Sequence, residues 1–268
     1  MTTTQASLDE RLDAARAAGR VLARMSPGAK VQVLEAVAQA LVARSEAIIA
    51  MNAEDLADAR KSNAPAAMVD RLMLDQARIE GMAEAIRAVA ALPDPVGTIT
   101  GGWRVPNGLE IVETRVPLGV IGVIYEGRPN VTTDAAALAL KSGNAIVLRG
   151  SRIAARSNEV LGEVVASAIA GAGVPPAAVT MLGTDRDEML RLIQAEGKVD
   201  LVIPRGRRGP QGLPAAERPR AGHLRGVGQL PRVRGCRRRP RRRPGHRRER
   251  QGAAPGRVQR LRDPARSP

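Results

Sequence analysis

The chain has 268 residues and a formal net charge of +15, but its basic residues are unevenly distributed. From Arg205 onward it carries 21 arginines, no lysine and three acidic residues, whereas the preceding part holds 21 basic and 24 acidic residues. This excludes a basic surface spread over the whole chain, the usual footprint of a nucleic-acid-binding domain. The single cysteine, Cys236, excludes an intramolecular disulfide.

The first ten residues, MTTTQASLDE, lack the basic and then apolar segments of a secretory signal peptide. The apolar runs along the chain are far shorter than the roughly 20 residues that a membrane helix requires. We therefore expect a cytoplasmic protein without membrane contact.

Residues 7 to 92 are expected to be helical and residues 97 to 116 to form an antiparallel arm. Helix start signals occur at three places: Ser7 with Glu10, Ser26 with Pro27, and Asn52 with Asp55. Apolar residues recur at helical spacing from Gln76 to Ala91, and two prolines follow. Asn107-Gly108 lies between two short β-prone runs and predicts a hairpin.

From residue 119 onward, strands and helices alternate. Strands are expected at 119–125, 145–148, 179–182 and 201–203, and helices at 132–142, 157–172 and 185–195. This order predicts an α/β fold with a doubly wound parallel sheet. Ligands bind such sheets at the carboxyl ends of the strands, where the loops 126–130 and 149–151 would lie. No GxGxxG follows either strand, so the residues alone leave open two ordinary loops in another α/β protein.

The run RVPLGVIGVIYEGRPNVTTDAAALALKSGNAIVLRGS, residues 115–151, resembles the aldehyde dehydrogenase superfamily and, within it, the gamma-glutamyl phosphate reductases. Residues 68–97 and 199–206 resemble the same family, so the likeness covers about residues 8–206. It departs from the family at Gly127, where alanine is usual, and at Ser151, where glycine is usual. The resemblance implies an aldehyde-dehydrogenase-like fold for residues 1–206, with N-terminal helices followed by a domain that binds a nucleotide cofactor.

The resemblance also implies a reaction. It is the reduction of L-glutamate 5-phosphate to L-glutamate 5-semialdehyde with release of phosphate, using NADPH, in L-proline biosynthesis. The family attacks the acyl phosphate with a cysteine thiolate. No residue reports unambiguously on the cofactor's 2′ position, so the residues alone do not decide between NADP and NAD. The arm implies a homo-oligomer for the intact family protein.

Site residues follow from the same resemblance. Asn130 is expected to donate to the developing oxyanion, and the alternative is an ordinary turn asparagine. The resemblance places Lys141, Arg149, Gly150 and Ser151 at the cofactor ribose and adenine. Arg149 would pair with a 2′-phosphate, and the alternative for Lys141 is a solvated helix end. Arg128 would bind a substrate carboxylate or phosphate, or else form a structural ion pair. No metal site is expected.

Residues 207–268 are rich in arginine, proline and glycine, lack aromatic residues, and are expected to be disordered. The family's VGNCHVYVD and QRPGVCNAxETLL blocks, the second holding the nucleophile, do not occur. Back-translation with G/C-rich codons, read one base later from near Arg207, restores both blocks. The nucleophile's codon then straddles Val258 and Gln259. We therefore expect an out-of-frame segment, no catalytic domain and no activity.

Other residues of this segment suggest little chemistry. Cys236 is followed by three arginines, which would lower its pKa, but it has no supporting shell. His223 and His246 lack metal-ligand spacing. The alternative function is nonspecific nucleic-acid binding through the arginines, which would be strongly salt-dependent. The absence of aromatic residues for base stacking counts against it.

Overall fold

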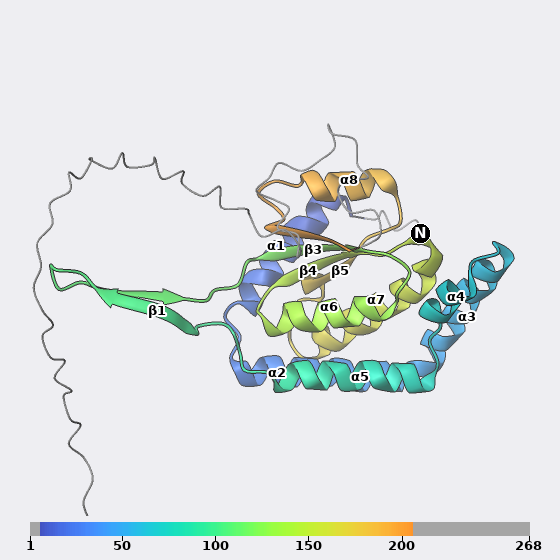
Figure 1. Cartoon of the computed structure of the whole chain (residues 1–268), viewed down its shortest axis with the longest axis horizontal. Coiled ribbons are helices and arrows are strands. Elements are labelled where there is room, and N and C mark those ends of the chain that lie inside the picture. The colour runs from blue at the N-terminus through green and yellow to red at the C-terminus, as the bar shows by residue number, and fades with distance from the viewer. Residues whose placement is uncertain (1–5, 206–268) are drawn as a thin grey trace, which may run out of the picture. The chain divides into compact units, whose positions relative to one another are not determined.

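The computed structural model describes residues 6–205. The expectations for residues 207–268, including those for Cys236, His223 and His246, lie outside the described residues. Between Ala6 and Arg205 the chain forms an α/β unit (Figure 1). No helix within these residues is long and apolar enough to cross a membrane.

The first part of this unit is helical, as expected. Its helices are α1 (Leu8–Leu22), α2 (Pro27–Ala43), α3 (Ser45–Lys61), α4 (Ala66–Leu72) and α5 (Gln76–Ala91). Ser7 and Glu10 form a reciprocal capping box at α1, and Ser26 caps α2 with Pro27 in its first turn. Both start signals are therefore confirmed.

The third start signal is wrong. Asn52 and Asp55 lie inside α3, which begins seven residues earlier, at Ser45. Both side chains are buried, and they bind groups of α7 and of the segment after α4 rather than the amides of α3. Residue types that favour helix starts are used here for contacts between distant segments.

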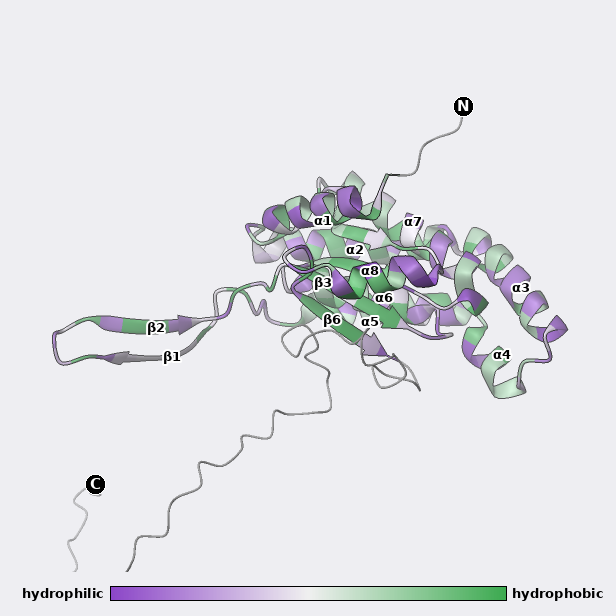
Figure 2. Cartoon of the chain, turned by 90° about the horizontal axis from the view of Figure 1, so that it is seen from above, coloured by the Kyte–Doolittle hydropathy of each residue, from purple (hydrophilic) through white to green (hydrophobic). Residues whose placement is uncertain are grey.

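The expected arm is a two-stranded antiparallel hairpin of β1 (Ile99–Arg104) and β2 (Glu110–Thr114). Gly108 in its turn has a φ of 88°, which glycine adopts without strain. The strands pair with each other and not with the second sheet. The hydropathy colours of Figure 2 show hydrophobic residues along the middle of β2. Large apolar side chains of the hairpin stay exposed, among them Ile99, Trp103 and Val112.

The second sheet confirms the predicted doubly wound topology. Its strands are β3 (Val120–Tyr125), β4 (Ala145–Arg149), β5 (Val179–Met181) and β6 (Leu201–Arg205), all parallel in the order β5-β4-β3-β6. The chain moves outward from β3 to β5 and then returns to the other side of β3 with β6. The strand order therefore reverses between β3 and β6, the position at which such sheets bind ligands.

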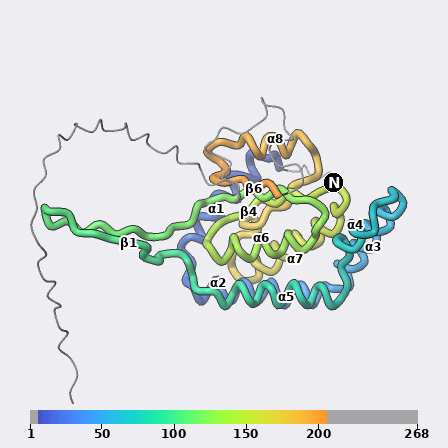
Figure 3. The backbone as a smooth tube through the Cα atoms, in the orientation of Figure 1, coloured from blue at the N-terminus to red at the C-terminus, as the bar shows by residue number. Residues whose placement is uncertain are grey.

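Helices cover both faces of this sheet. The connecting elements are α6 (Asn130–Lys141), η1 (Arg152–Ala154), α7 (Ala155–Gly171), η2 (Pro176–Ala178) and α8 (Arg186–Gln194). Val120 and Val147 face an apolar cluster with α1 and α8, whereas Val123 and Leu148 face one with α6 and α7. Helices α2 and α5 pack beyond α6 and α7 (Figure 3). Burial on both faces explains the continuous apolar runs of the strands.

Candidate functional site

Two loops meet at the carboxyl edge of the sheet. One follows β3 and carries Arg128 and Asn130, and the other follows β4 and carries Gly150 and Ser151. The parallel register of Ile124 with Arg149 brings the two strand ends level. A Cβ on Gly127 in the first loop would lie 3.3 Å from Cγ2 of Ile153 in η1, which directly follows the second loop, so the two loops are neighbours.

Arg149 ends β4 at this edge. Its Nη2 donates to the carbonyl oxygen of Thr184, at 2.9 Å, in the loop after β5. Its Nε is buried and has no hydrogen-bond partner within the described residues. Burial lowers the pKa of Arg149, while the carboxylates of Asp185 and Glu188 oppose that shift. The guanidinium thus keeps an unused donor at the edge of the sheet.

Ser151, two residues after Arg149, also has a polar side-chain atom without a partner in the described part of the chain. Its Oγ is buried and has no partner within residues 6–205. Gly150 between the two is required by packing, because a Cβ there would lie 2.1 Å from Nδ2 of Asn158 and 3.3 Å from the hydroxyl of Tyr125. Because buried polar groups are nearly always paired, two orphaned atoms two residues apart indicate a place for a polar ligand.

A buried hydrogen-bond network supports this loop from below. The hydroxyls of Tyr125 and Thr132 lie 2.6 Å apart, and Oγ1 of Thr132 also donates to Oδ1 of Asn158 at 3.1 Å. Burial raises the pKa of Tyr125, which therefore stays a neutral hydroxyl. The network joins the end of β3, the start of α6 and the start of α7.

Asn130 begins α6 at the reversal point. Its Nδ2 donates to Oδ2 of Asp134, one helical turn later, at 2.9 Å. Burial raises the pKa of Asp134, and the bond from Asn130 and the charge of Arg205 partly offset that effect. Asn130, Asp134 and Arg205 therefore lie together where β3 and β6 end. Arg128 is exposed, and no partner for its side chain is found in the described part of the chain.

Lys141 is not brought to this edge, which corrects its assignment to the cofactor. Helix α6 runs from the carboxyl end of β3 back to the amino end of β4, so its last residue lies at the opposite edge. There Nζ of Lys141 donates to the carbonyl oxygen of Ala90 at 2.7 Å, and the side chain is buried. It is not a solvated helix end either, because it pairs with the last turn of α5.

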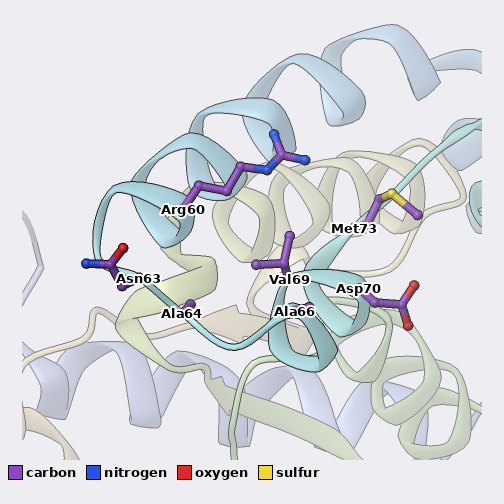
Figure 4. A pocket seen from close by; sticks show the side chains of 7 residues that line it. All are labelled: Arg60, Asn63, Ala64, Ala66, Val69, Asp70 and Met73. Carbon is purple, nitrogen blue, oxygen red and sulfur yellow. The ribbon is translucent and has the colours of Figure 1, made fainter.

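A separate cavity of about 550 Å³ opens between the end of α3 and α4 (Figure 4). It contains none of the expected site residues. Its lining residues are Arg60, Asn63, Ala64, Ala66, Val69, Asp70 and Met73. Within residues 6–205, no group of three or more histidine, cysteine, aspartate or glutamate side chains could hold a metal ion.

Comparison with known proteins identifies the family. The model of the aldehyde dehydrogenase family matches residues 1–208, more than three quarters of the chain. The chain belongs to the aldehyde dehydrogenase family. Gamma-glutamyl phosphate reductase of Thermobifida fusca is 51% identical over 207 residues, which are 77% of this chain and 50% of that protein.

Two solved structures of gamma-glutamyl phosphate reductases also resemble this aldehyde dehydrogenase family member. The enzyme from Thermotoga maritima has a TM-score of 0.76 and 35% identity over 82% of this chain and 53% of its own. The one from Saccharomyces cerevisiae has a TM-score of 0.69 and 32% identity over 76% and 52%. This chain thus spans about half the length of these relatives.

The fold of the aldehyde dehydrogenase family implies a nicotinamide cofactor, and the carboxyl edge fits one. Arg149 and Ser151 offer unpaired buried polar atoms there. Gly150 lets Asn158 and Tyr125 pack against the backbone between them. The sequence interpretation missed Thr184 and Asn158, which hold this loop from segments that no local pattern connects to it. It also missed Asp134, although the spacing of four residues from Asn130 on a helix could have indicated that contact.

Proposed function

We propose that residues 6–205 are the cofactor-binding half of a gamma-glutamyl phosphate reductase. The whole enzyme would reduce L-glutamate 5-phosphate to L-glutamate 5-semialdehyde with NADPH and release phosphate, a step of L-proline biosynthesis in the cytoplasm. The observation that carries this proposal is 51% identity to such a reductase across the segment that forms the helices, the arm and the sheet.

NADPH supplies the hydride when it is bound. Arg149 and Ser151 would hold its adenosine end, because their unpaired Nε and Oγ are a cationic donor and a hydroxyl at the end of β4. A guanidinium with a free donor suits a 2′-phosphate, which favours NADPH over NADH. Gly150 would contribute indirectly, because the absence of a side chain leaves room for Asn158 and Tyr125, which support the loop.

Asn130 would stabilise the negative charge that develops on the substrate's carbonyl oxygen. One hydrogen of its amide is used by Asp134, which fixes the side chain and leaves the second hydrogen for the oxyanion. A neutral donor that is already oriented is what such a site requires. Arg128, exposed in the same loop, would attract the carboxylate or phosphate of L-glutamate 5-phosphate.

This chain would not catalyse the reduction by itself. The thiolate that displaces phosphate and forms a thioester has no counterpart in residues 6–205, which contain no cysteine. The intact protein would also associate with copies of itself through the arm, whose exposed Trp103 and Val112 suit an apolar contact.

Two expressed forms of the gene test the proposal. One encodes the present chain, and the other has a single base removed near codon 207 to restore the reading frame. NADPH formation is followed from L-glutamate 5-semialdehyde, phosphate and NADP. We expect turnover only in the restored form, and NADPH binding in both. No turnover by the restored, folded protein would refute the proposed activity.

Nonspecific nucleic-acid binding is a second candidate, favoured only by the 21 arginines from Arg205 onward. We expect weak retention of DNA that disappears steeply with salt and does not depend on sequence. Binding that discriminates between sequences at physiological salt would favour this candidate over the reductase.

A further inference from the structure

The helix that follows the proposed cofactor loop has no cap of its own. Helix α7 starts at Ala155, and its N-cap residue, Ala154, has no side chain able to accept a hydrogen bond. The first amides of a helix are left unpaired unless another group accepts from them. At α7, that group comes from a segment about a hundred residues earlier in the chain.

Asp55 of α3 supplies it. Its Oδ2 accepts from the backbone amide of Ser157 at 2.8 Å and from the Ser157 hydroxyl at 2.7 Å. Its Oδ1 faces the backbone amide of Arg156 at 3.4 Å. The carboxylate is 2% exposed, so it is a buried acceptor held at the positive end of α7.

Asn52, one turn earlier on α3, extends this contact. Its Nδ2 donates to the carbonyl oxygen of Leu72 at 2.8 Å and to Oγ of Ser157 at 3.0 Å, and its Oδ1 accepts from the amide of Leu74 at 2.8 Å. Asn52 is fully buried. The buried polar face of α3 therefore ties α7 to the end of α4.

These contacts reach both loops of the carboxyl edge. Leu72 and Ala154 share one apolar cluster with α3, and Ile153 packs against it. A Cβ on Gly127 would lie 3.3 Å from Ile153 and 3.5 Å from Leu72, so the loop after β3 rests on the same cluster. Ser151 lies only four residues before Ala155. The start of α7 therefore fixes the backbone that presents Arg149 and Ser151.

We propose that Asp55 is a positioning residue of the dinucleotide site, which it shapes from α3 by capping α7. The carboxylate of Asp55 already occupies the free amides at the start of α7, the position at which other helices bind anions. We therefore expect no cofactor phosphate at α7. The inference rests on the proposed function, because it requires that the loop after β4 binds NADPH.

The full chain, titrated with NADPH well below its unfolding temperature, tests this. Asp55→Asn keeps the shape but removes the charge and one acceptor. We expect the dissociation constant for NADPH to rise about fivefold, the scale of one lost helix cap. The reason is that the loop conformation that binds NADPH is less populated. The matched control is Asp58→Asn, since Asp58 pairs with the same Arg156 at 2.9 Å but accepts no bond from an amide of α7. The control should bind like the unaltered chain.

A second variant separates positioning from general stability. Asp55→Ala should bind NADPH still more weakly, and sodium formate should recover part of that affinity by returning a carboxylate to the amides, whereas sodium chloride at equal ionic strength should not. Equal NADPH affinity for the unaltered chain, Asp55→Asn and Asp55→Ala would overturn the inference and leave the proposed function standing. If the unaltered, folded chain does not bind NADPH, the cofactor role proposed for this half fails as well.

Discussion

The two edges of the parallel sheet differ in whether the polar atoms of their basic residues have hydrogen-bond partners. At the amino edge, Nζ of Lys30 contacts both carboxylate oxygens of Asp94, at 3.1 and 2.9 Å, and Lys141 donates to Ala90. At the carboxyl edge, Arg149 keeps an unpaired Nε and Ser151 an unpaired Oγ. Both edges carry buried polar groups, but only one leaves them without partners.

This difference teaches how to separate structural from ligand-binding residues. A buried charge with complete partners already has its compensation, so a ligand gains nothing from it. A buried donor without a partner destabilises the protein until something binds. Lys141 and Arg149 were both expected at the cofactor, and their hydrogen bonds support the proposal for Arg149 alone.

The largest expected effect comes from breaking the pair at the amino edge. Lys30→Met leaves the carboxylate of Asp94, 8% exposed, without its cation. We expect a loss of about 3–5 kcal/mol in the free energy of unfolding, the usual result of removing one partner of a buried ion pair. Urea denaturation measures it. The double variant Lys30→Met/Asp94→Leu should recover much of the loss, and a single variant as stable as the parent would contradict the account of this edge.

The same pair predicts a pH dependence of stability. Burial alone would raise the pKa of Asp94, but the bonds from Lys30 and from the amide of Val96 outweigh it and place the pKa below its usual range. A depressed pKa stabilises the fold above the unfolded value, about 3.9, and that contribution is lost as the pH falls through the folded value. Unfolding midpoints measured between neutral pH and pH 3 should therefore decline less in Asp94→Asn than in the unaltered chain.

At the carboxyl edge, Gly150→Ala should be destabilising by about 1–3 kcal/mol, the range for overpacking. Its Cβ would displace Asn158 and weaken the bond from Thr132. Thermal unfolding compares it with Gly81→Ala in α5, where the added Cβ meets no atom within 4 Å. The control should be stabilising, since alanine favours a helix over glycine. If both changes have the same sign, the close approach at Gly150 is incorrect.

The smallest effect is expected at Gly127. Gly127→Ala brings a Cβ to 3.3 Å from Cγ2 of Ile153, so this side-chain end must shift by a few tenths of an ångström. The reduced freedom of the unfolded chain favours alanine by about 0.4–1 kcal/mol, so the net change should stay within about 1 kcal/mol. A loss of free energy of unfolding as large as that of Gly150→Ala would contradict this expectation, because it would show that the two loops are packed too rigidly for Ile153 to shift.

Much of the fold was accessible from sequence because its signals are local. The segment from Gln76 to Ala91, whose apolar spacing predicted a helical segment before two prolines, is helix α5, and the continuous apolar run that ends at Tyr125 predicted a strand buried on both faces. Asn52 and Asp55 were misread because their partners lie about 20 and 100 residues away. A local sequence pattern does not include both residues of such a contact.

The candidate site could be predicted from the sequence only in part. The resemblance pointed to the loops after β3 and β4, but it could not show that Thr184 and Asn158 support Arg149 and Gly150. The error at Lys141 was avoidable, since a helix joining two parallel strands must end at the amino edge. The position of a residue along its helix already decided which edge it would reach.

The most direct test of the contrast between the two edges is NADPH titration of three forms of the full chain: unaltered, Arg149→Met and Lys141→Met. We expect Arg149→Met to weaken binding about tenfold or more, the scale of a lost hydrogen bond from a charged group, with a smaller effect on NADH. Lys141→Met should lower stability, because the carbonyl of Ala90 loses its donor, and should leave the affinity unchanged. Equal loss of NADPH affinity in both variants, or in Lys141→Met alone, would contradict the assignment of the cofactor site to the carboxyl edge.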